Sequence, residues 1–407
     1  MDIVYERVCG LDIHKDMIAA CMIKKGRRER RQFGTMTDDL LQLSAWLIEN
    51  DCQMTAMEST GSYWKPIYNI LEAENVPVII ANAQHIKAVP GRKTDVKDSE
   101  WIADLLRHGL VNASFVPPRE LRDLRELVRY RKSLIQERAR EFNRIQKVLE
   151  GANIKLGSVI SNIDGKSGCA IVDAIIGGET DPEKLTNFAK GSLRKKQDIL
   201  GRSLTGLIND HLRNILFLMR RHVRCLDELV ETADLQIYSY LTAENDVLER
   251  LMTIPGVGQK SAEVIVSEIG TDMSQFPSAR HLASWAGICP GNNESAGKRY
   301  SGRIRKANNN LKTTLAQCAK VNALKRGTYL NAQYSRIAAR RGPNRATIAV
   351  AHTILIIAYH IIKDGTVYHE LGDNYFDELK KDAILNRSLR RIEALGYDVT
   401  VSLHESS

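Results

Sequence analysis

The order of β-like and helical patterns over residues 3–114 constrains the fold of this chain more than any other feature. Short apolar runs have the length and residue types of strands, and amphipathic stretches separate the later runs. The expected elements are strands at 4–13, 17–23, 31–36, 54–57 and 76–81 and helices at 37–49, 62–74 and 94–108. Three strands followed by strand and helix alternation predict an α/β domain over residues 1–117.

Four carboxylates occur where this domain can bring them together. Asp12 lies on the first strand, Glu58 directly follows the fourth, and Asp95 and Asp98 lie on the helix after the fifth. Both helical acids continue the apolar stripe that must face the sheet. Two Mg²⁺ ions about 3.5 to 4 Å apart neutralise phosphodiester oxygens and polarise a nucleophile, and Mg²⁺ prefers oxygen ligands. The quartet therefore predicts a two-metal site that cuts a polynucleotide.

Each acid also has an ordinary explanation when it is taken alone. Asp95 would stabilise the N-terminus of its helix through the helix dipole. Glu58 could end a strand in a turn, and Asp12 could pair with Lys15 or His14. The metal interpretation depends on all four acids falling in register.

Two long helical patterns follow this domain. Residues 118–152 form an unbroken helical pattern. Between 204 and 240 apolar residues alternate steps of four and three, broken once by His222, which is typical of a coiled coil within or between chains. Residues 153–202 are expected to connect the two through short helices. The region 118–246 is therefore expected to mediate oligomerisation.

A glycine-containing turn lies between two helical patterns at 251–270. The spacing matches a helix-hairpin-helix, in which backbone N–H groups near Gly256 and Gly258 can approach a phosphate. The same turn can also serve only to join two helices. A basic segment rich in glycine and asparagine follows at 281–312, and further helices are expected at 311–324 and 344–362.

Positive charge favours an anionic partner. Lys and Arg outnumber Asp and Glu by 58 to 49, which gives a net charge of +9. The glycine turn, the basic segment and two arginines on the apolar stripe of the first long helix are the candidate contacts, the arginines for nucleic acid or another subunit. The candidate nucleic-acid contacts are Arg131, Arg138, Gly256, Gly258, Lys260, Lys298, Arg299, Arg303, Arg305 and Lys306.

Cysteine usage and hydropathy exclude several classes. The seven cysteines form no C-x-x-C pair, so neither a zinc ribbon nor a disulfide framework is indicated. Dispersed cysteines fit a reducing cytosol. We expect no leader, and the longest apolar stretch, 348–362, is interrupted by polar residues and too short to span a bilayer. The expected location is cytoplasmic and associated with the nucleoid.

Five separated motifs in one order resemble the insertion-sequence 110 (IS110) family of transposases. They are GLDIHKD, MEST, KTDVKD, IPGVG and a serine-glycine basic loop, within about 7–376, and the C-terminal part resembles the subgroup with an extended tail. The resemblance implies an RNase H-like domain of RuvC type in which Asp12, Glu58, Asp95 and Asp98 bind Mg²⁺. It also implies a serine nucleophile, at Ser295, that joins covalently to DNA, and a guide RNA that pairs with donor and target DNA.

Two departures from the family pattern affect how these roles are assigned to residues of this chain. Lys306-Ala307-Asn308-Asn309 stands where the family often has Lys-x-Gly-Asn, so Asn308 is expected to replace a glycine, and Asn tolerates the left-handed conformation. The stretch ESAGK has one glycine where two are common, and Ser301, also followed by glycine, competes with Ser295 for the role of nucleophile.

The expected function is that of a DNA transposase or recombinase acting as a dimer or tetramer. The acids and the serine could meet within one chain or across subunits. One rival is a resolvase-type nuclease in which the acids activate water, and another is a nucleic-acid-binding scaffold without activity. The expected domains are 1–117 (RNase H-like), 118–246 (long helices), 247–376 (helical, with the serine and the helix-hairpin-helix) and 377–407 (tail).

Overall fold

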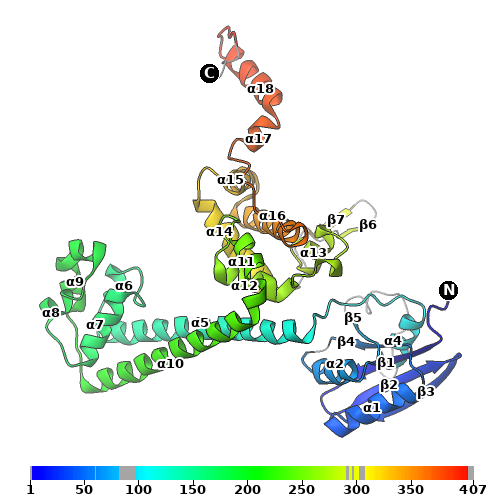
Figure 1. Ribbon diagram of the computed structural model, residues 1–407. Helices are drawn as coiled ribbons and strands as arrows, with labels where there is room; N and C mark the ends of the chain where they lie inside the picture. Colours follow the sequence, from blue (N-terminus) through cyan, green and yellow to red (C-terminus); the bar gives the residue numbers. More distant parts are fainter. Residues whose placement is uncertain are drawn as a thin grey trace. The chain divides into compact units, whose positions relative to one another are not determined.

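The chain divides into two compact units, Met1–Val116 and Pro117–Ser407 (Figure 1). The computed structural model describes residues 2–59, 61–81, 98–289 and 308–401, together with the backbone of 293–295 and 298–301. The first unit is α/β, and the second is helical apart from one short hairpin.

A five-stranded mixed sheet forms the first unit. Its strands are β1 (Arg7–Ile13), β2 (Ile18–Lys24), β3 (Arg27–Phe33), β4 (Met54–Glu58) and β5 (Val78–Ala81). The spatial order is β3-β2-β1-β4-β5, with the first three antiparallel and β4 parallel to both β1 and β5. Lys25 and Gly26 have positive φ angles of 50° and 81° in the turn between β2 and β3, as a tight hairpin requires.

Helices cover both faces of this sheet. On one face α1 (Thr37–Glu49) and α2 (Trp64–Ala73) bury Leu43, Leu47 and Leu71 against β1 and β4. On the other face α4 (Asp98–Arg107) packs against alternate residues of the same strands. The edge strand β3 is exposed and charged along most of its length, which discourages edge-to-edge pairing.

Two long helices of the second unit pack side by side (Figure 1). They are α5 (Arg119–Gly151) and α10 (Asp210–Leu241). A small bundle at one end joins them and shares a core with both helices. It consists of α6 (Leu156–Val159), α7 (Lys166–Ile176), α8 (Pro182–Thr186), the 3-10 helix η2 (Gly191–Lys196) and α9 (Gln197–Leu204). The two long helices thus pair within one chain.

The buried face of α10 differs from the expected seam. The helix begins at Asp210 rather than near 204, because Asn209 caps it by accepting a hydrogen bond from Leu212 N at 2.9 Å. Leu226 and Ala233 of the expected seam are buried, but nearer the start of the helix the buried residues are Leu216, Arg220 and Val223, each one position after an expected seam residue. The side chain of His222, expected within the seam, is 42% exposed. The rotation follows from packing against the bundle as well as α5, which a heptad count does not anticipate.

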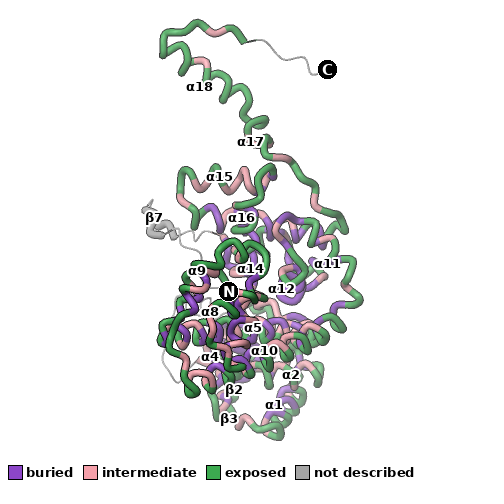
Figure 2. The backbone as a smooth tube through the Cα atoms, turned by 90° about the vertical axis from the view of Figure 1, so that its left-hand side faces the viewer, coloured by how far each residue is buried: buried purple, intermediate pink, exposed green. Residues whose placement is uncertain are grey.

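The remaining helices form a helical body with a C-terminal extension. Its elements are η3 (Thr242–Glu244), α11 (Asn245–Met252), α12 (Gln259–Ile269), η4 (Met273–Gln275), α13 (Ala279–Trp285), β6 (Asn293–Ser295), β7 (Lys298–Ser301), α14 (Asn309–Leu324), α15 (Tyr329–Arg341), α16 (Pro343–Asp364), α17 (Tyr375–Glu378) and α18 (Lys381–Glu393). Within the described residues, α16 alone is long and apolar enough to cross a membrane. It is mostly buried among α11, α13, α14 and α15, and α18 has no buried residue (Figure 2).

Candidate functional site

Strand alternation places two of the predicted acids on the face of the sheet covered by α4. Val8 on β1 and Ala56 on β4 pack against that helix, whereas Leu11 and Met57 pack on the opposite face. Because side chains alternate along a strand, Asp12 shares the face of Val8, and Glu58 shares the face of Ala56. Both acids are partly exposed at the strand ends.

The register of the parallel pair brings these two acids level. Leu11 on β1 pairs with Met57 on β4, so the next residue along each strand is Asp12 and Glu58. Side chains at the ends of neighbouring parallel strands emerge at the same edge of a sheet. Asp98 is the first residue of α4, on the same face. Asp95 lies outside the described residues.

α4 touches the sheet without an intervening side chain. A Cβ atom on Gly10 would collide with the carbonyl oxygen of Ser99 and the backbone nitrogen of Ala103. Glycine is therefore required at this crossing. This close approach holds the start of α4 beside the strand that carries Asp12.

Arginines of β3 pair with acids of α4. Arg28 donates to Glu100 at 3.0 Å and to Asp104 at 2.5 Å, and Arg30 lies 2.7 Å from the 5%-exposed side chain of Glu100. Asp12 contacts only the Nε2 atom of His14, at 3.1 Å, among the contacts given for the described residues. Within the described residues, no ion pair joins Asp12 or Glu58 to an arginine of β3. Sequence reasoning missed Glu100, whose partner Arg28 lies 72 residues away.

The donor chemistry of this edge fits Mg²⁺, but the described acids form no closed cage. Among residues 2–59, 61–81, 98–289 and 308–401, no three His, Cys, Asp or Glu side chains form a group able to hold one metal ion. Mg²⁺ is usually bound by one or two carboxylates together with waters and substrate phosphates. The oxygen ligands present therefore suit Mg²⁺ bound together with substrate.

The two arginines on the stripe of α5 are engaged within the chain, contrary to the expectation of external contacts. Arg131 is 3% exposed and donates to Glu263 at 2.5 Å and Asp234 at 2.6 Å. Arg138 donates to Asp227 at 2.5 Å and Asp164 at 3.0 Å. Buried cations need paired carboxylates. The arginines lie on the apolar stripe because they join α5 to neighbouring helices.

The glycine turn between α11 and α12 is tied to the helical body. Gly256 has a φ angle of +80°, and a Cβ atom there would lie 2.6 Å from Asn322 Nδ2. Asn322 itself donates to the carbonyl oxygen of Pro255 at 2.6 Å. Packing against α14 thus explains Gly256. Gly258 has no atom within 4 Å of its built Cβ and keeps an open approach, while Lys260 donates to Asp234 at 3.1 Å.

A buried ionic cluster secures the start of α14. Glu268 is fully buried, and both of its carboxylate oxygens accept hydrogen bonds from Arg129 at 2.8 Å. Arg125 donates to the backbone oxygen of Glu268 at 2.7 Å, and Asn308 Nδ2 donates to its carboxylate at 2.6 Å. Burial lowers the pKa of Arg125 to about 10, although the charge of Glu268 opposes this. Sequence reasoning did not find this cluster.

The conformation of Asn308 differs from the expected one. Its φ angle is −55°, not left-handed, and its side chain caps α14 by accepting a hydrogen bond from Leu311 N at 3.1 Å. The expected left-handed conformation was wrong because the position is a helix N-cap, where asparagine is favoured. From α5, Lys132 adds hydrogen bonds to Thr313 at 2.8 Å and Asn310 at 3.2 Å in the same turn.

The candidate nucleophile lies on a short hairpin. Ser295 ends β6 and pairs with Lys298 on β7, whereas Ser301 pairs with Asn293 at the other end. Arg299 also lies on β7. Arg303, Arg305 and Lys306 lie outside the described residues. The backbone therefore distinguishes the two candidate serines by position, and places a basic residue opposite Ser295.

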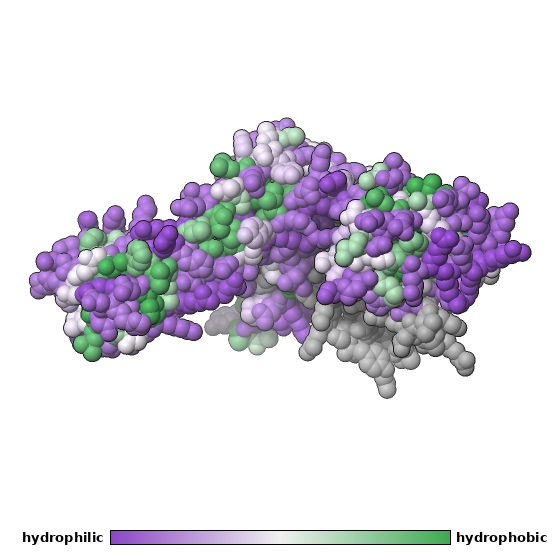
Figure 3. Space-filling view, turned by 90° about the horizontal axis from the view of Figure 1, so that it is seen from below, coloured by the Kyte–Doolittle hydropathy of each residue, from purple (hydrophilic) through white to green (hydrophobic). Residues whose placement is uncertain are grey.

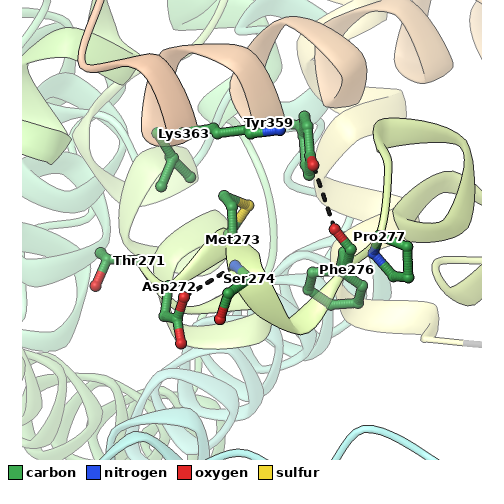
Figure 4. Close-up of a pocket in the computed structure, with 9 residues that line it drawn as sticks. Thr271, Asp272, Met273, Ser274, Phe276, Pro277, Tyr359 and Lys363 are labelled. Carbon is green, nitrogen blue, oxygen red and sulfur yellow. Dashed lines mark hydrogen bonds between the residues drawn. The ribbon is translucent and has the colours of Figure 1, made fainter.

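A cavity of about 460 Å³ lies between η4 and α16 (Figure 4). Tyr359 donates to the carbonyl oxygen of Phe276 at 3.2 Å across it, and Asp272 caps η4 by accepting from Ser274 N at 2.9 Å. Lys363 is the single cation among its lining residues. None of the predicted site residues lines this cavity.

Comparisons with known proteins agree with this layout. A family model for DEDD transposases of IS110 type matches residues 9–154, and a model described as the transposase IS116/IS110/IS902 family matches 248–335. The first includes the strands that carry Asp12 and Glu58. The second includes the hairpin that carries Ser295.

Curated relatives point the same way. The transposase for insertion sequence element IS1328 of Yersinia enterocolitica is 24% identical over 88% of this chain and 97% of its own length. The pilin gene-inverting protein of Moraxella bovis is 24% identical over 70% of this chain and 73% of its own. A DEDD domain implies the RNase H-like fold for the mixed sheet. The chain belongs to the IS110 family of transposases and is a DNA transposase or recombinase enzyme.

Proposed function

We propose that this enzyme cuts and rejoins DNA through a covalent link to Ser295, with Mg²⁺ held by Asp12, Glu58, Asp95 and Asp98. The level placement of Asp12 and Glu58 on the α4 face, with Asp98 at the start of that helix, carries the proposal. Mg²⁺ at these oxygens would neutralise the charge that develops on the phosphate.

The serine step balances without an external energy source. Ser295 Oγ attacks the phosphorus, the bond from phosphorus to one DNA oxygen breaks, and that oxygen gains the proton that the serine loses. The reverse attack by a DNA hydroxyl rejoins the strand. A hydroxyl is a weak nucleophile and needs a base or a metal ion to activate it. The phosphoserine link retains the phosphodiester bond energy, so exchange needs no ATP.

Trapping the DNA-linked peptide tests the serine. We expect Ser295→Ala to bind DNA but to form no adduct, whereas Ser301→Ala, the matched control on the same hairpin, should retain adduct formation. Adducts that persist in Ser295→Ala and map to Ser301 would reassign the nucleophile. Unchanged strand cleavage without any adduct in the wild-type enzyme would favour the hydrolytic nuclease.

A guide RNA and a dimer or tetramer complete the proposal. The RNA rests on the family resemblance and on the net charge of +9. Exposed apolar side chains on α10 support a contact between copies, among them Leu218 (61% exposed), Leu235 (72%) and Tyr238 (63%). Figure 3 shows apolar patches on an otherwise hydrophilic surface.

Mixing inactive chains tests whether catalysis crosses subunits. Activity restored by combining Asp12→Asn with Ser295→Ala would show that acids and serine meet between chains.

For the RNA, copurified transcript that is protected from nuclease is the expected result. An active, RNA-free enzyme would contradict the guide.

A further inference from the structure

A second cavity of about 460 Å³ lies in the small bundle, between the segment after α6, the start of α7 and η2. Three lysines line it, Lys166, Lys190 and Lys196, together with hydroxyl and amide side chains. No carboxylate and no aromatic ring is among its lining residues. The cavity is far in sequence from the acids and from Ser295.

The walls of this cavity are tied together by the fold. Ser167 Oγ accepts a hydrogen bond from the backbone nitrogen of Lys190 at 3.0 Å, which joins η2 to the first turn of α7. A Cβ atom on Gly168 would collide with the carbonyl oxygen of Ile163, so the preceding segment lies directly against α7. The lysines therefore emerge from connected backbone segments rather than from independent loops.

Two acids of the bundle are paired with arginines of the long helices. Arg138 on α5 binds Asp164 at 3.0 Å. Arg220 on α10 binds both carboxylate oxygens of Asp173 at 2.8 Å. Burial alone would raise the pKa of Asp173, but hydrogen bonds and charge from Arg220 and Arg224 lower it. Lys184 lies 3.7 Å from Glu179. The long helices thus supply the counter-charges of Asp164 and Asp173, and Lys184 of the bundle supplies that of Glu179.

The lysines of the cavity take no part in these ion pairs. Lys166, Lys190 and Lys196 are exposed, and within the described part of the chain none of them has a carboxylate within 4.0 Å. Three like charges around one cavity repel one another unless an anion lies between them. The N-terminus of α7 adds a partial positive charge there, which by itself would not make a site.

We propose that this cavity, the lysine cavity, binds the phosphodiester backbone of nucleic acid. Lysines and hydroxyl groups suit phosphate oxygens, whereas stacking on bases requires aromatic rings that the lining lacks. The contact is therefore independent of base sequence. The inference rests on the proposed function only in naming nucleic acid as the ligand. It adds a binding region that lies outside the family motifs.

The salt dependence of binding tests the proposal. We compare Lys166→Gln/Lys190→Gln/Lys196→Gln with a control of equal charge from the same bundle, Lys155→Gln/Lys184→Gln/Lys195→Gln, whose residues do not line the cavity. The probes are duplex DNA and the element's transcript. Each lost phosphate contact reduces the slope of log affinity against log salt by about 0.9 on duplex and about 0.7 on single strands.

Loss of the cavity lysines is expected to reduce the slope by up to about 2.7 on duplex DNA or about 2 on single-stranded RNA, with the control near wild type. A reduction on one probe alone identifies DNA or RNA as the source of the backbone. An unchanged slope on both probes, or equal reductions in both triple variants, would overturn the proposal. Single Lys166→Gln and Lys190→Gln variants should each give about a third of the effect.

Adduct formation separates this inference from the proposed chemistry. A reduced slope together with no adduct in the wild-type enzyme would sustain the cavity and defeat the serine. A normal Ser295 adduct together with an unchanged salt slope would sustain the serine and defeat the lysine cavity.

Discussion

Two groups of carboxylates in this protein contrast in how their charges are used. Asp12 and Glu58 lie partly exposed at strand ends, and in the part of the chain that the structure describes no ion pair joins them to an arginine of β3. Glu268 is fully buried and is held by Arg125, Arg129 and Asn308. A buried charge must be paired inside the fold, whereas a partly exposed charge at an accessible edge can serve a ligand. The same contrast separates Arg131 from the lysines of the cavity.

The strongest test of this contrast is Asp12→Asn. We expect strand cleavage in Mg²⁺ to fall about a thousandfold or more, because a lost metal ligand removes several kcal/mol of transition-state stabilisation. Thermal stability should change little. Asp16→Asn, an acid in the following turn, is the control. Intact strand exchange in Asp12→Asn would defeat the metal proposal and favour a non-catalytic scaffold.

Glu268→Gln should instead act on folding. Breaking a buried pair by removing one partner costs about 3 to 5 kcal/mol, since Arg125 and Arg129 would lose their counter-charge. Denaturant unfolding measures this loss. The exposed Glu231→Gln should stay within about 0.5 kcal/mol of wild type. Equal stability of the two variants would show that Glu268 is not a structural acid.

The cap at Asn308 sharpens the comparison at one residue. Asn308→Ala should lose about 0.5 to 2 kcal/mol of unfolding free energy, because the first turn of α14 loses its cap. Asn308→Ser should recover most of this loss, since serine caps helices well. The difference that remains between Asn308→Ser and wild type reports the hydrogen bond to Glu268. A variant Asn308→Gly more stable than wild type would contradict the negative φ angle.

The smallest effect concerns Asp234. Burial alone would raise the pKa of this carboxyl, but hydrogen bonds from Arg131 and Lys260 outweigh it and lower the pKa below 3.8. The carboxylate therefore stabilises the folded state above the unfolded pKa, and this stability is lost as pH falls through the folded pKa. Wild type should exceed Asp234→Asn by about 1 kcal/mol or less near neutral pH. A gap that widens on acidification would contradict the pairing.

Local patterns predicted much of the first unit. Alternation along β1 and β4, and the helical stripe of α1, depend on residues close in sequence, so the strands and the shared face of Asp12 and Glu58 could be inferred. The partners of Arg131 lie 103 and 132 residues away, beyond the reach of periodicity. A usable signal was present in α12, where Glu263 and Glu268 interrupt an apolar run and therefore require cations.

The second unit was predicted less well for a related reason. The pattern at 204–240 gave a helix, yet the face that is buried depends on the bundle and on α5 together. Asn308 was interpreted from a family glycine, although its neighbours at 309–312 begin a helix and favour a cap. For α10 a tertiary partner absent from the local pattern decides the outcome, whereas for Asn308 the local pattern already contained the signal.

The close contact at Gly10 makes the edge that carries Asp12 and Glu58 tolerant of substitutions elsewhere in the core. Since main chain meets main chain there, the spacing between α4 and β1 is set by rigid peptide groups and not by the sizes of apolar side chains nearby. Replacements elsewhere in the interior can accumulate while this spacing stays constant. A single added methyl group at position 10, by contrast, would act as a wedge and lift Asp98 away from the sheet.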